Sequence, residues 1–327
     1  MPFHKEPLYF GDDLTRRYGR MSLDDYLRLF HDAKPGQRIG EASTWYLYST
    51  SAAREIREFS PDAQVTVMLR NPVDVMYAQH NQLIFNAMEP ITDFGEALAA
   101  EDDRRAGRRL PEWPINVENL FYRHSVRFAE QLERYFEVFG RDRVHVMLHD
   151  DLVRDGAGVI GGYLEFLGVD ASLAAPPPTA NENRRVRSPR LQRFIFMPRV
   201  LMPLAPLLRR FPYVRALRTR LLNMNSEARP RAPMDSALRR RLLDEQAPEI
   251  EKLGRLIGRD LSPWLEREGS LQSSFAPMPT LGMTNIVLAR ITSRDVGLVV
   301  LDRCRVCQRY AETVVAPAHA PAERTLG

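Results

Sequence analysis

Two short, largely apolar runs interrupt an otherwise mixed pattern of hydrophobic and polar positions along the chain. Residues 65–69 read VTVML and residues 144–148 read VHVML, and each run is bounded by polar residues. Such runs are typical of strands that are covered on both faces, as in a parallel sheet. Three other stretches repeat apolar residues at helical spacing, which predicts amphipathic helices over residues 22–30, 119–140 and 233–257. Strands that alternate with helices indicate an α/β fold with a parallel sheet.

The residues that follow the first run carry the clearest local signal. Asn71 and Pro72 predict a helix start, with Asn71 as the N-cap and Pro72 in the first helical position, and Asp74 falls in the favourable first turn. Arg70 stands at the strand end, where ligands gather in open parallel sheets. Because a guanidinium matches the geometry of phosphate oxygens, this turn predicts an anion site. An ordinary strand-turn-helix with a surface arginine is the alternative.

Further elements are expected on either side of this turn. Residues 37–43 predict another buried strand with Glu41 at its end, followed by a turn into a helix that reaches about Phe59. A second helix, long and capped by Asn119, should lead to the second apolar run. Strand, helix, strand order implies right-handed parallel crossovers, so Glu41 and Arg70 should lie at the same edge of neighbouring strands.

A short charged motif near the N-terminus precedes aromatic residues. Lys5, Glu6 and Pro7 are followed by the apolar triplet LYF at residues 8–10. Pro7 disfavours helical geometry at Glu6. A carboxylate that lies beside an ammonium and next to aromatic bulk suits a general base in a partly dry pocket. A solvated N-terminal loop is the alternative.

Composition and charge narrow the classes of function. The chain has 327 residues, of which 44% are hydrophobic and 27% charged, as is ordinary for a soluble globular protein. The net charge of +4 is a modest excess, which favours an anionic ligand and no nucleic acid. We find no apolar run that could span a membrane and no secretory signal. Two cysteines cannot build a disulfide framework, so a reducing, cytoplasmic location is expected.

Several motifs, in their order and spacing, resemble the bacterial branch of the sulfotransferases that use 3′-phosphoadenosine 5′-phosphosulfate (PAPS), which is related to the heparan sulfate sulfotransferases. The motifs are KEPLYF, GEASTWYLYS, VTVMLRNPVDVMYAQHNQL, NLFYRHSVRFAEQLERYFEVFGRDRVHVMLHDDL, FLGVD and NENRRVRSPRL. Together they cover roughly residues 3–268 of the chain.

The resemblance implies a fold and a reaction. The fold would be a P-loop-kinase-like parallel sheet flanked by helices. The reaction would be in-line transfer of a sulfuryl group from PAPS to a hydroxyl or amine of a carbohydrate, lipid or small-molecule acceptor, without a metal. Glu6 matches the family's catalytic base, and Lys5 beside it is assigned to the same catalytic group. Glu41 and Tyr9 are assigned to the acceptor substrate.

The resemblance also implies which residues bind the nucleotide. Arg70 matches the arginine that binds the 3′-phosphate, and Ala78 stands where the family usually has a serine on the same phosphate. In the family the region around residues 181–190 folds over the nucleotide, so Arg184, Arg185 and Arg187 are candidate phosphate contacts. Arginines that are merely solvated are the alternative.

One family feature is not found in this sequence. The family opens with a strand and a Gly-rich, Lys-containing loop that cradles the 5′-phosphosulfate, and no such loop occurs here. The first strand and the phosphate loop are therefore expected to be missing, upstream of Met1. Two alternatives to an active sulfotransferase stay open: a catalytically silent nucleotide-binding or protein-interaction module, and a small-molecule kinase on the same scaffold.

The remaining stretches give weaker expectations. We expect a sulfotransferase domain over residues 1–268 and a partly disordered extension over residues 269–327. Residues 190–222 interleave arginines, apolar residues and prolines, and they could contact a membrane surface, line an acceptor site or pack on the core. Residues 102–109 predict a charged loop over the acceptor side, or a solvated face. The single C-x-x-C of residues 304–307 lacks a second pair for structural zinc, so no metal is expected.

Overall fold

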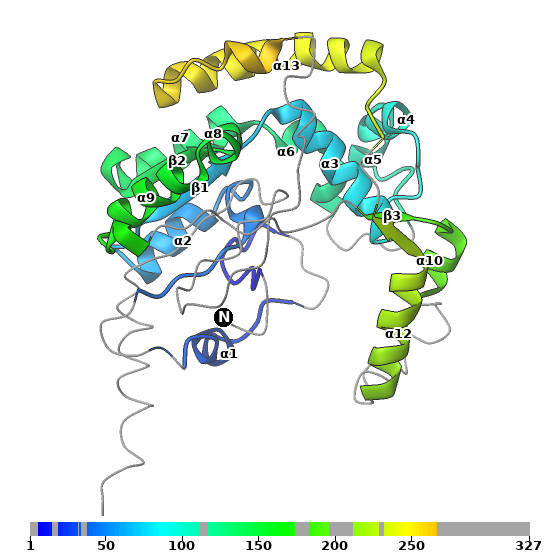
Figure 1. The fold of residues 1–327 in the computed structure, drawn as a ribbon, viewed down its shortest axis with the longest axis horizontal. Helices are drawn as coiled ribbons and strands as arrows, with labels where there is room; N and C mark the ends of the chain where they lie inside the picture. The colour runs from blue at the N-terminus through cyan, green and yellow to red at the C-terminus, as the bar shows by residue number, and fades with distance from the viewer. Residues whose placement is uncertain are drawn as a thin grey trace, which may run out of the picture. The chain divides into compact units, whose positions relative to one another are not determined.

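A computed structural model of the chain is shown in Figure 1. The structure describes residues 6–14, 19–31, 33, 38–111, 117–173, 184–195, 212–228 and 232–266. They fall into two compact units, which we treat separately. The first unit holds the described residues up to Arg70 and those from Phe128 to Leu173, and the second holds the others. None of the described helices is long and apolar enough to cross a membrane.

The first unit is organised around two parallel strands, β1 (Val65–Leu69) and β2 (Val144–Leu148). Val65 pairs with Val144 and Leu69 with Leu148, and every residue of β1 is buried, so both strands predicted from the apolar runs are confirmed. Helices surround this pair (Figure 1). The helices of this unit are α1 (Leu23–Arg28), η1 (Thr44–Tyr46), α2 (Ala52–Phe59), α7 (Phe128–Phe139), η3 (Arg141–Arg143), α8 (His149–Arg154), α9 (Gly156–Leu167) and η4 (Ala171–Leu173).

Side chains from both strands and from α9 form part of the core of the first unit. Met68 of β1 and Met147 of β2 pack with Tyr163 and Leu167, which lie one helical turn apart on α9. Gly168 then ends the helix in the left-handed conformation, with φ of 67°, where a residue without Cβ is least strained. Helix α9 thus covers the sheet on this side, and Gly168 determines where this helix ends.

Three elements differ from the expectations. Residues 38–43 form only an isolated bridge at Ala42, so the strand predicted over 37–43 is wrong as a continuous strand. Gly40 weakens a strand there, and Glu41 bonds to side-chain hydroxyls. The helix expected to reach Phe59 is divided into η1 and α2. The long helix expected after Asn119 is wrong as one helix: the chain there forms η2 (Val117–Leu120), α6 (Tyr122–Ser125) and α7, of which η2 and α6 belong to the second unit and α7 to the first.

The second unit is mostly helical. Its start is as predicted: Asn71 caps α3 (Pro72–Phe85) by accepting a hydrogen bond from the amide of Val73 at 3.0 Å. β3 (Arg184–Val186) pairs antiparallel with β4 (Ser226–Ala228). The other elements of this unit are α4 (Phe94–Ala99), α5 (Glu101–Arg105), η2, α6, α10 (Pro189–Ile195), α12 (Pro212–Met224), α13 (Ser236–Ile257) and η6 (Ser262–Leu265). The amphipathic helix predicted over 233–257 is confirmed as α13.

A fully buried ion pair lies in the core of the second unit. Arg104 Nη2 lies 2.8 Å from Glu89 Oε1, and both side chains are 0% exposed. Tyr122 donates its hydroxyl to the other oxygen of Glu89 at 2.6 Å, and burial together with the charge of Glu89 raises the pKa of Tyr122. The charged loop expected over 102–109 is therefore wrong at its start, because Glu101–Arg105 is helical and Arg104 points into the core.

Neutralising Arg104 should destabilise the protein far more than neutralising its neighbour. Arg104→Met leaves the Glu89 carboxylate buried without its partner, so we expect a loss of about 3–5 kcal/mol in the free energy of unfolding. Arg105→Met is the matched control: its pair with Asp102 is 51% and 94% exposed, and we expect a loss below about 1 kcal/mol. Urea unfolding of both variants checks this, and equal losses would contradict it.

Candidate active site

The buried carboxylate of Glu41 is the centre of a hydroxyl network in the first unit. Glu41 is 4% exposed. Tyr46 donates its hydroxyl to Glu41 Oε1 at 2.5 Å, Ser43 donates to Oε2 at 2.9 Å, and Tyr26 makes a longer bond of 3.4 Å to Oε1. The short helix η1 produces this arrangement, because it folds Tyr46 back toward a residue only five positions earlier.

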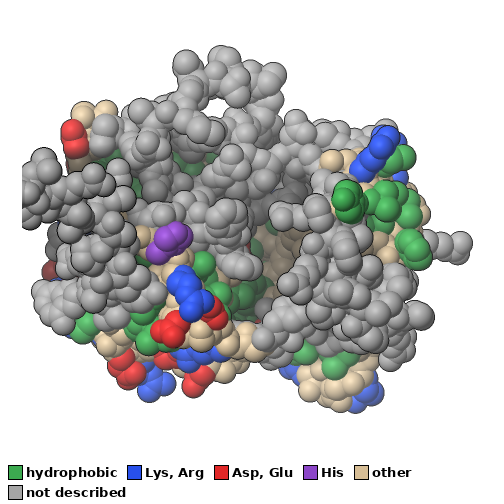
Figure 2. Space-filling view, turned by 90° about the horizontal axis from the view of Figure 1, so that it is seen from below, with side chains coloured by type: hydrophobic (Ala, Val, Ile, Leu, Met, Phe, Trp, Pro, Cys, Tyr) green, Lys and Arg blue, Asp and Glu red, His purple; other side chains and the backbone are tan. Residues whose placement is uncertain are grey.

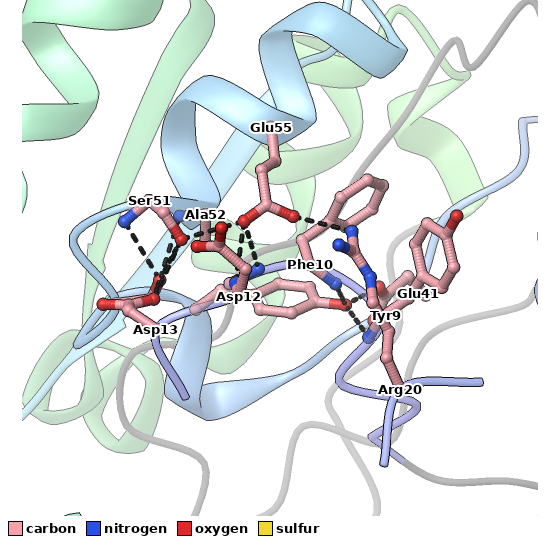
Figure 3. Close-up of polar contacts among 12 residues, drawn as sticks. Tyr9, Phe10, Asp12, Asp13, Arg20, Glu41, Ser51, Ala52 and Glu55 are labelled. Carbon is pink, nitrogen blue, oxygen red and sulfur yellow. Dashed lines mark hydrogen bonds and ion pairs between the residues drawn. The ribbon is translucent and has the colours of Figure 1, made fainter. Parts of the chain in front are cut away.

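The same hydroxyls hold the N-terminal segment that carries Glu6. Ser43 Oγ accepts a hydrogen bond from the amide of Leu8 at 3.2 Å. The hydroxyl of Tyr46 accepts from the amides of Tyr9 and Phe10 at 2.8 and 3.3 Å (Figure 3). Glu41 therefore acts on this segment through two hydroxyls, each of which donates to the carboxylate and accepts from the main chain.

The segment continues into a turn that is fastened to α2. Glu55 of α2 accepts hydrogen bonds from the amides of Gly11 and Asp12 at 3.2 and 2.8 Å (Figure 3). Asp13 accepts from the amide of Thr50 at 2.7 Å and from hydroxyls before α2, and these bonds lower its pKa although burial alone would raise it. Gly11 has φ of 83°, and a Cβ there would lie 2.8 Å from Ser49 Oγ. The turn needs glycine for both reasons.

Glu6 lies half-buried at the start of this segment. Its φ is 56°, outside right-handed helical geometry as Pro7 predicted, and Leu8 also has a positive φ of 49°. Such left-handed geometry costs about 1–3 kcal/mol per non-glycine residue, and the bonds to the Leu8 and Tyr9 amides help to hold it. Thr44 Oγ1 donates a long hydrogen bond of 3.5 Å to the Glu6 carboxylate. The structure therefore brings Glu6 and Glu41 into one network.

The titration of Glu41 reflects this setting. Burial raises the pKa of Glu41 from its usual 4.5 to about 7, against the opposing effect of the hydrogen bonds from Tyr46, Ser43 and Tyr26. The negative charge of Glu6 raises it further. Because the pKa lies near neutrality, Glu41 exchanges a proton in the range where many enzymes work.

Tyr9, assigned to the acceptor from the sequence, packs in an aromatic cluster. Its ring stacks on that of Tyr26 with centroids 4.2 Å apart, and the guanidinium of Arg20 lies 4.6 Å above the Tyr9 ring. Arg20 is also paired with Glu55 at 2.6 Å (Figure 3). The cluster gives the Glu6 segment an apolar support on one side.

The residues assigned to the nucleotide are distributed over both units. Arg70 lies half-buried directly after β1, in the first unit, at the strand end where the sequence predicted it. Ala78 is half-buried in α3 of the second unit. Arg187 of that unit is exposed, and its amide bonds to the carbonyl of Asn225 at 2.8 Å. Arg184 and Arg185 lie in β3, whose side chains are not described.

Two further assignments lie outside the described residues, namely Lys5 and the cysteines at 304 and 307. Within the described residues, no group of three or more His, Cys, Asp or Glu side chains could hold a metal ion.

Tyr46, Ser43, Asp13 and Glu55 had no predicted role. A signal for the first two is present in GEASTWY, where hydroxyl residues stand two and five positions after Glu41. This spacing alone predicts no contact, because the turn at η1 is what brings the two hydroxyls to Glu41. Asp13 bonds to Thr50, and Glu55 bonds to the amide of Asp12. In each case the partners lie about 40 residues apart in the chain, so no local pattern joins the turn to α2.

Glu41→Gln should remove a pH dependence of stability. The folded chain holds the Glu41 proton up to about pH 7 and the unfolded chain only to about 4.5, so stability falls as pH rises through this window. Relative to the parent, the variant should gain about 3 kcal/mol in the free energy of unfolding between about pH 4.5 and pH 8. Denaturant unfolding at several pH values measures this. Glu58→Gln, at an exposed position of α2, is the control, and a gain as large in it would contradict the assignment.

No family model matches the chain. Among solved structures, it is similar to the crystal structure of a sulfotransferase from Alicyclobacillus acidocaldarius. The TM-score is 0.57 and the sequence identity 26%, over 81% of this chain and 87% of that chain. The chain therefore has a sulfotransferase-like α/β fold, as the sequence predicted, and the similarity supports a transferase of this broad class.

Proposed function

We propose that the protein is a sulfotransferase that takes its sulfuryl group from PAPS and transfers it to a hydroxyl or amine of a carbohydrate, lipid or small molecule. The observation that carries the proposal is the structural similarity to a sulfotransferase over 81% of the chain. The motifs that resemble the family cover roughly residues 3–268, which supports the proposal from the sequence. The two cysteines favour a cytoplasmic location.

Glu6 is the catalytic base in this proposal. As the new bond forms between the acceptor oxygen and sulfur, and the bond from sulfur to the 5′-phosphate oxygen breaks, Glu6 accepts the acceptor's proton. The half-buried position of its carboxylate supports this role, because partial exclusion of water strengthens a charged hydrogen bond. Glu41 is a positioning residue: through Ser43 and Tyr46 it holds the main chain that follows Glu6.

Arg70 binds the nucleotide's 3′-phosphate in this proposal. Its place directly after β1 is the carboxyl end of a parallel strand, and its guanidinium can donate two parallel hydrogen bonds to one phosphate. PAPS supplies the activated sulfuryl group. A guanidinium in this place suits a phosphorylated nucleotide. From the sequence, Arg184, Arg185 and Arg187 are proposed as further phosphate contacts. Tyr9 is proposed to contact the acceptor.

Glu6→Gln should abolish most transfer while it leaves nucleotide binding intact. The amide cannot accept the acceptor's proton, so we expect a fall of about 10²–10⁴-fold in kcat. Transfer of radiolabelled sulfate from PAPS across a panel of acceptors measures this, with Glu58→Gln on the exposed face of α2 as the control. If the parent protein binds nucleotide and gives no product with any acceptor, the chain is a silent binding module and the proposed transfer is wrong.

Arg70→Ala should weaken the binding of 3′-phosphoadenosine 5′-phosphate. A hydrogen bond to a charged group contributes roughly 1.5–3 kcal/mol, so we expect Kd to rise by about 10- to 150-fold. Isothermal titration calorimetry measures the change. Arg54→Ala, at an exposed position of α2, removes the same charge and should leave Kd almost unchanged. Equal affinities of the parent protein and the Arg70 variant would show that another residue binds this phosphate.

A further inference from the structure

One face of α12 exposes large apolar side chains to solvent. Tyr213 is 79% exposed, Leu217 59% and Met224 63%. With the exposed Arg220 they stand at intervals of four, three and four residues, so all four lie on the same face of the helix. A helix of a globular protein normally turns its apolar face to the core. An apolar stripe on the exposed face therefore indicates a contact with a membrane or with another molecule.

Helix α10, which contacts α12, extends this apolar surface. Phe194 is 62% exposed and Leu191, one turn earlier, is 38% exposed. In Figure 2 hydrophobic side chains lie together beside a basic side chain at the right of the view, and no acidic side chain is coloured among them. We call Leu191, Phe194, Tyr213, Leu217, Arg220 and Met224 the α10–α12 surface.

Buried polar contacts fix the two helices that carry this surface. Asn225, directly after α12, donates to Gln192 of α10 at 2.8 Å and to the carbonyl of Ser188 at 3.0 Å. Gln192 in turn donates to the carbonyl of Phe85 at the end of α3 at 2.6 Å. Asn225 is 3% exposed and Gln192 1% exposed. The exposed apolar residues therefore lie on a fixed scaffold, so their exposure is a property of the fold.

Among its charged residues, the segment of sequence that contains this surface carries only positively charged side chains. Residues 183–226 contain eleven arginines and no acidic residue. These eleven charges exceed the net charge of +4 of the whole chain, so the rest of the chain is net negative. The partner of the α10–α12 surface should therefore combine negative charge with an apolar interior, which a second copy of this basic segment does not offer.

We propose that the α10–α12 surface binds the surface of an anionic lipid membrane. Phe194, Tyr213 and Leu217 enter the boundary between headgroups and acyl chains, and arginines of the segment pair with lipid phosphates. A membrane fits better than a nucleic acid, because the exposed residues are mainly apolar, whereas nucleic-acid interfaces are polar and strongly basic. The proposal is independent of the transfer reaction, since none of the six residues of the α10–α12 surface is assigned to it.

Cosedimentation of the full chain with lipid vesicles tests the proposal. The chain should bind vesicles in which about one-third of the phosphatidylcholine is replaced by phosphatidylglycerol, and bind pure phosphatidylcholine weakly. Binding should fall at high salt, because salt screens the arginine charges. Leu217→Ser combined with Arg220→Gln should weaken binding about tenfold or more. The matched control is Val153→Ser with Arg154→Gln on α8, where the same kinds of side chain are also exposed and binding should not change.

Three outcomes would overturn the proposal: no binding of the parent to anionic vesicles, equal binding by the α12 and α8 double variants, or loss of DNA binding in the α12 variant with vesicle binding intact. The last would identify a nucleic-acid surface. If Leu217→Ser with Arg220→Gln lowers the unfolding temperature, Tyr213→Ser replaces it, because Tyr213 is 79% exposed and its removal should not disturb the core. Tyr213→Ser should also weaken vesicle binding, and unchanged binding would count against the proposal.

Discussion

A buried carboxylate that is surrounded by hydroxyl groups organises the N-terminal segment that carries Glu6. Glu41 is buried, and the loss of water makes its negative charge unfavourable. Hydrogen bonds from Tyr46 and Ser43 offset part of this cost. Because a hydroxyl can donate and accept at once, each of these residues links Glu41 to a main-chain amide of the segment that carries Glu6. Glu41 therefore holds the main chain that follows Glu6 through these two hydroxyls.

The second unit uses a different solution for buried charge. Glu89 and Arg104 form an ion pair at 2.8 Å in a fully buried site, so each charge has an opposite charge within hydrogen-bond distance. Glu41 instead accepts hydrogen bonds from neutral hydroxyls, and its burial raises its pKa to about 7. The two buried carboxylates thus differ in their partners: Glu89 has an opposite charge beside it, whereas Glu41 has hydroxyl donors.

Charge is also distributed unevenly along the chain. The arginines of residues 183–226 include the candidate phosphate contacts at 184, 185 and 187 as well as Arg220 beside the exposed apolar stripe of α12. Under the two proposals, one basic segment attracts an anionic nucleotide at its start and an anionic membrane further on. Both use the same physical property, since phosphate oxygens are the common acceptors of guanidinium groups.

Local patterns of the sequence determined several elements correctly. The two apolar runs became β1 and β2 with the predicted bounds, and Asn71 and Pro72 began α3. These features depend on burial of short apolar runs and on capping by neighbouring residues, which act over a few positions.

Only the tertiary structure decided which of two adjacent arginines is buried. Arg104 is buried because it pairs with Glu89, 15 residues away, whereas Arg105 points to solvent. It also decided the environment of Glu41. Sequence shows the residue types, but the free energy of a charge depends on the water and the donors around it, and those come from residues that only folding brings together.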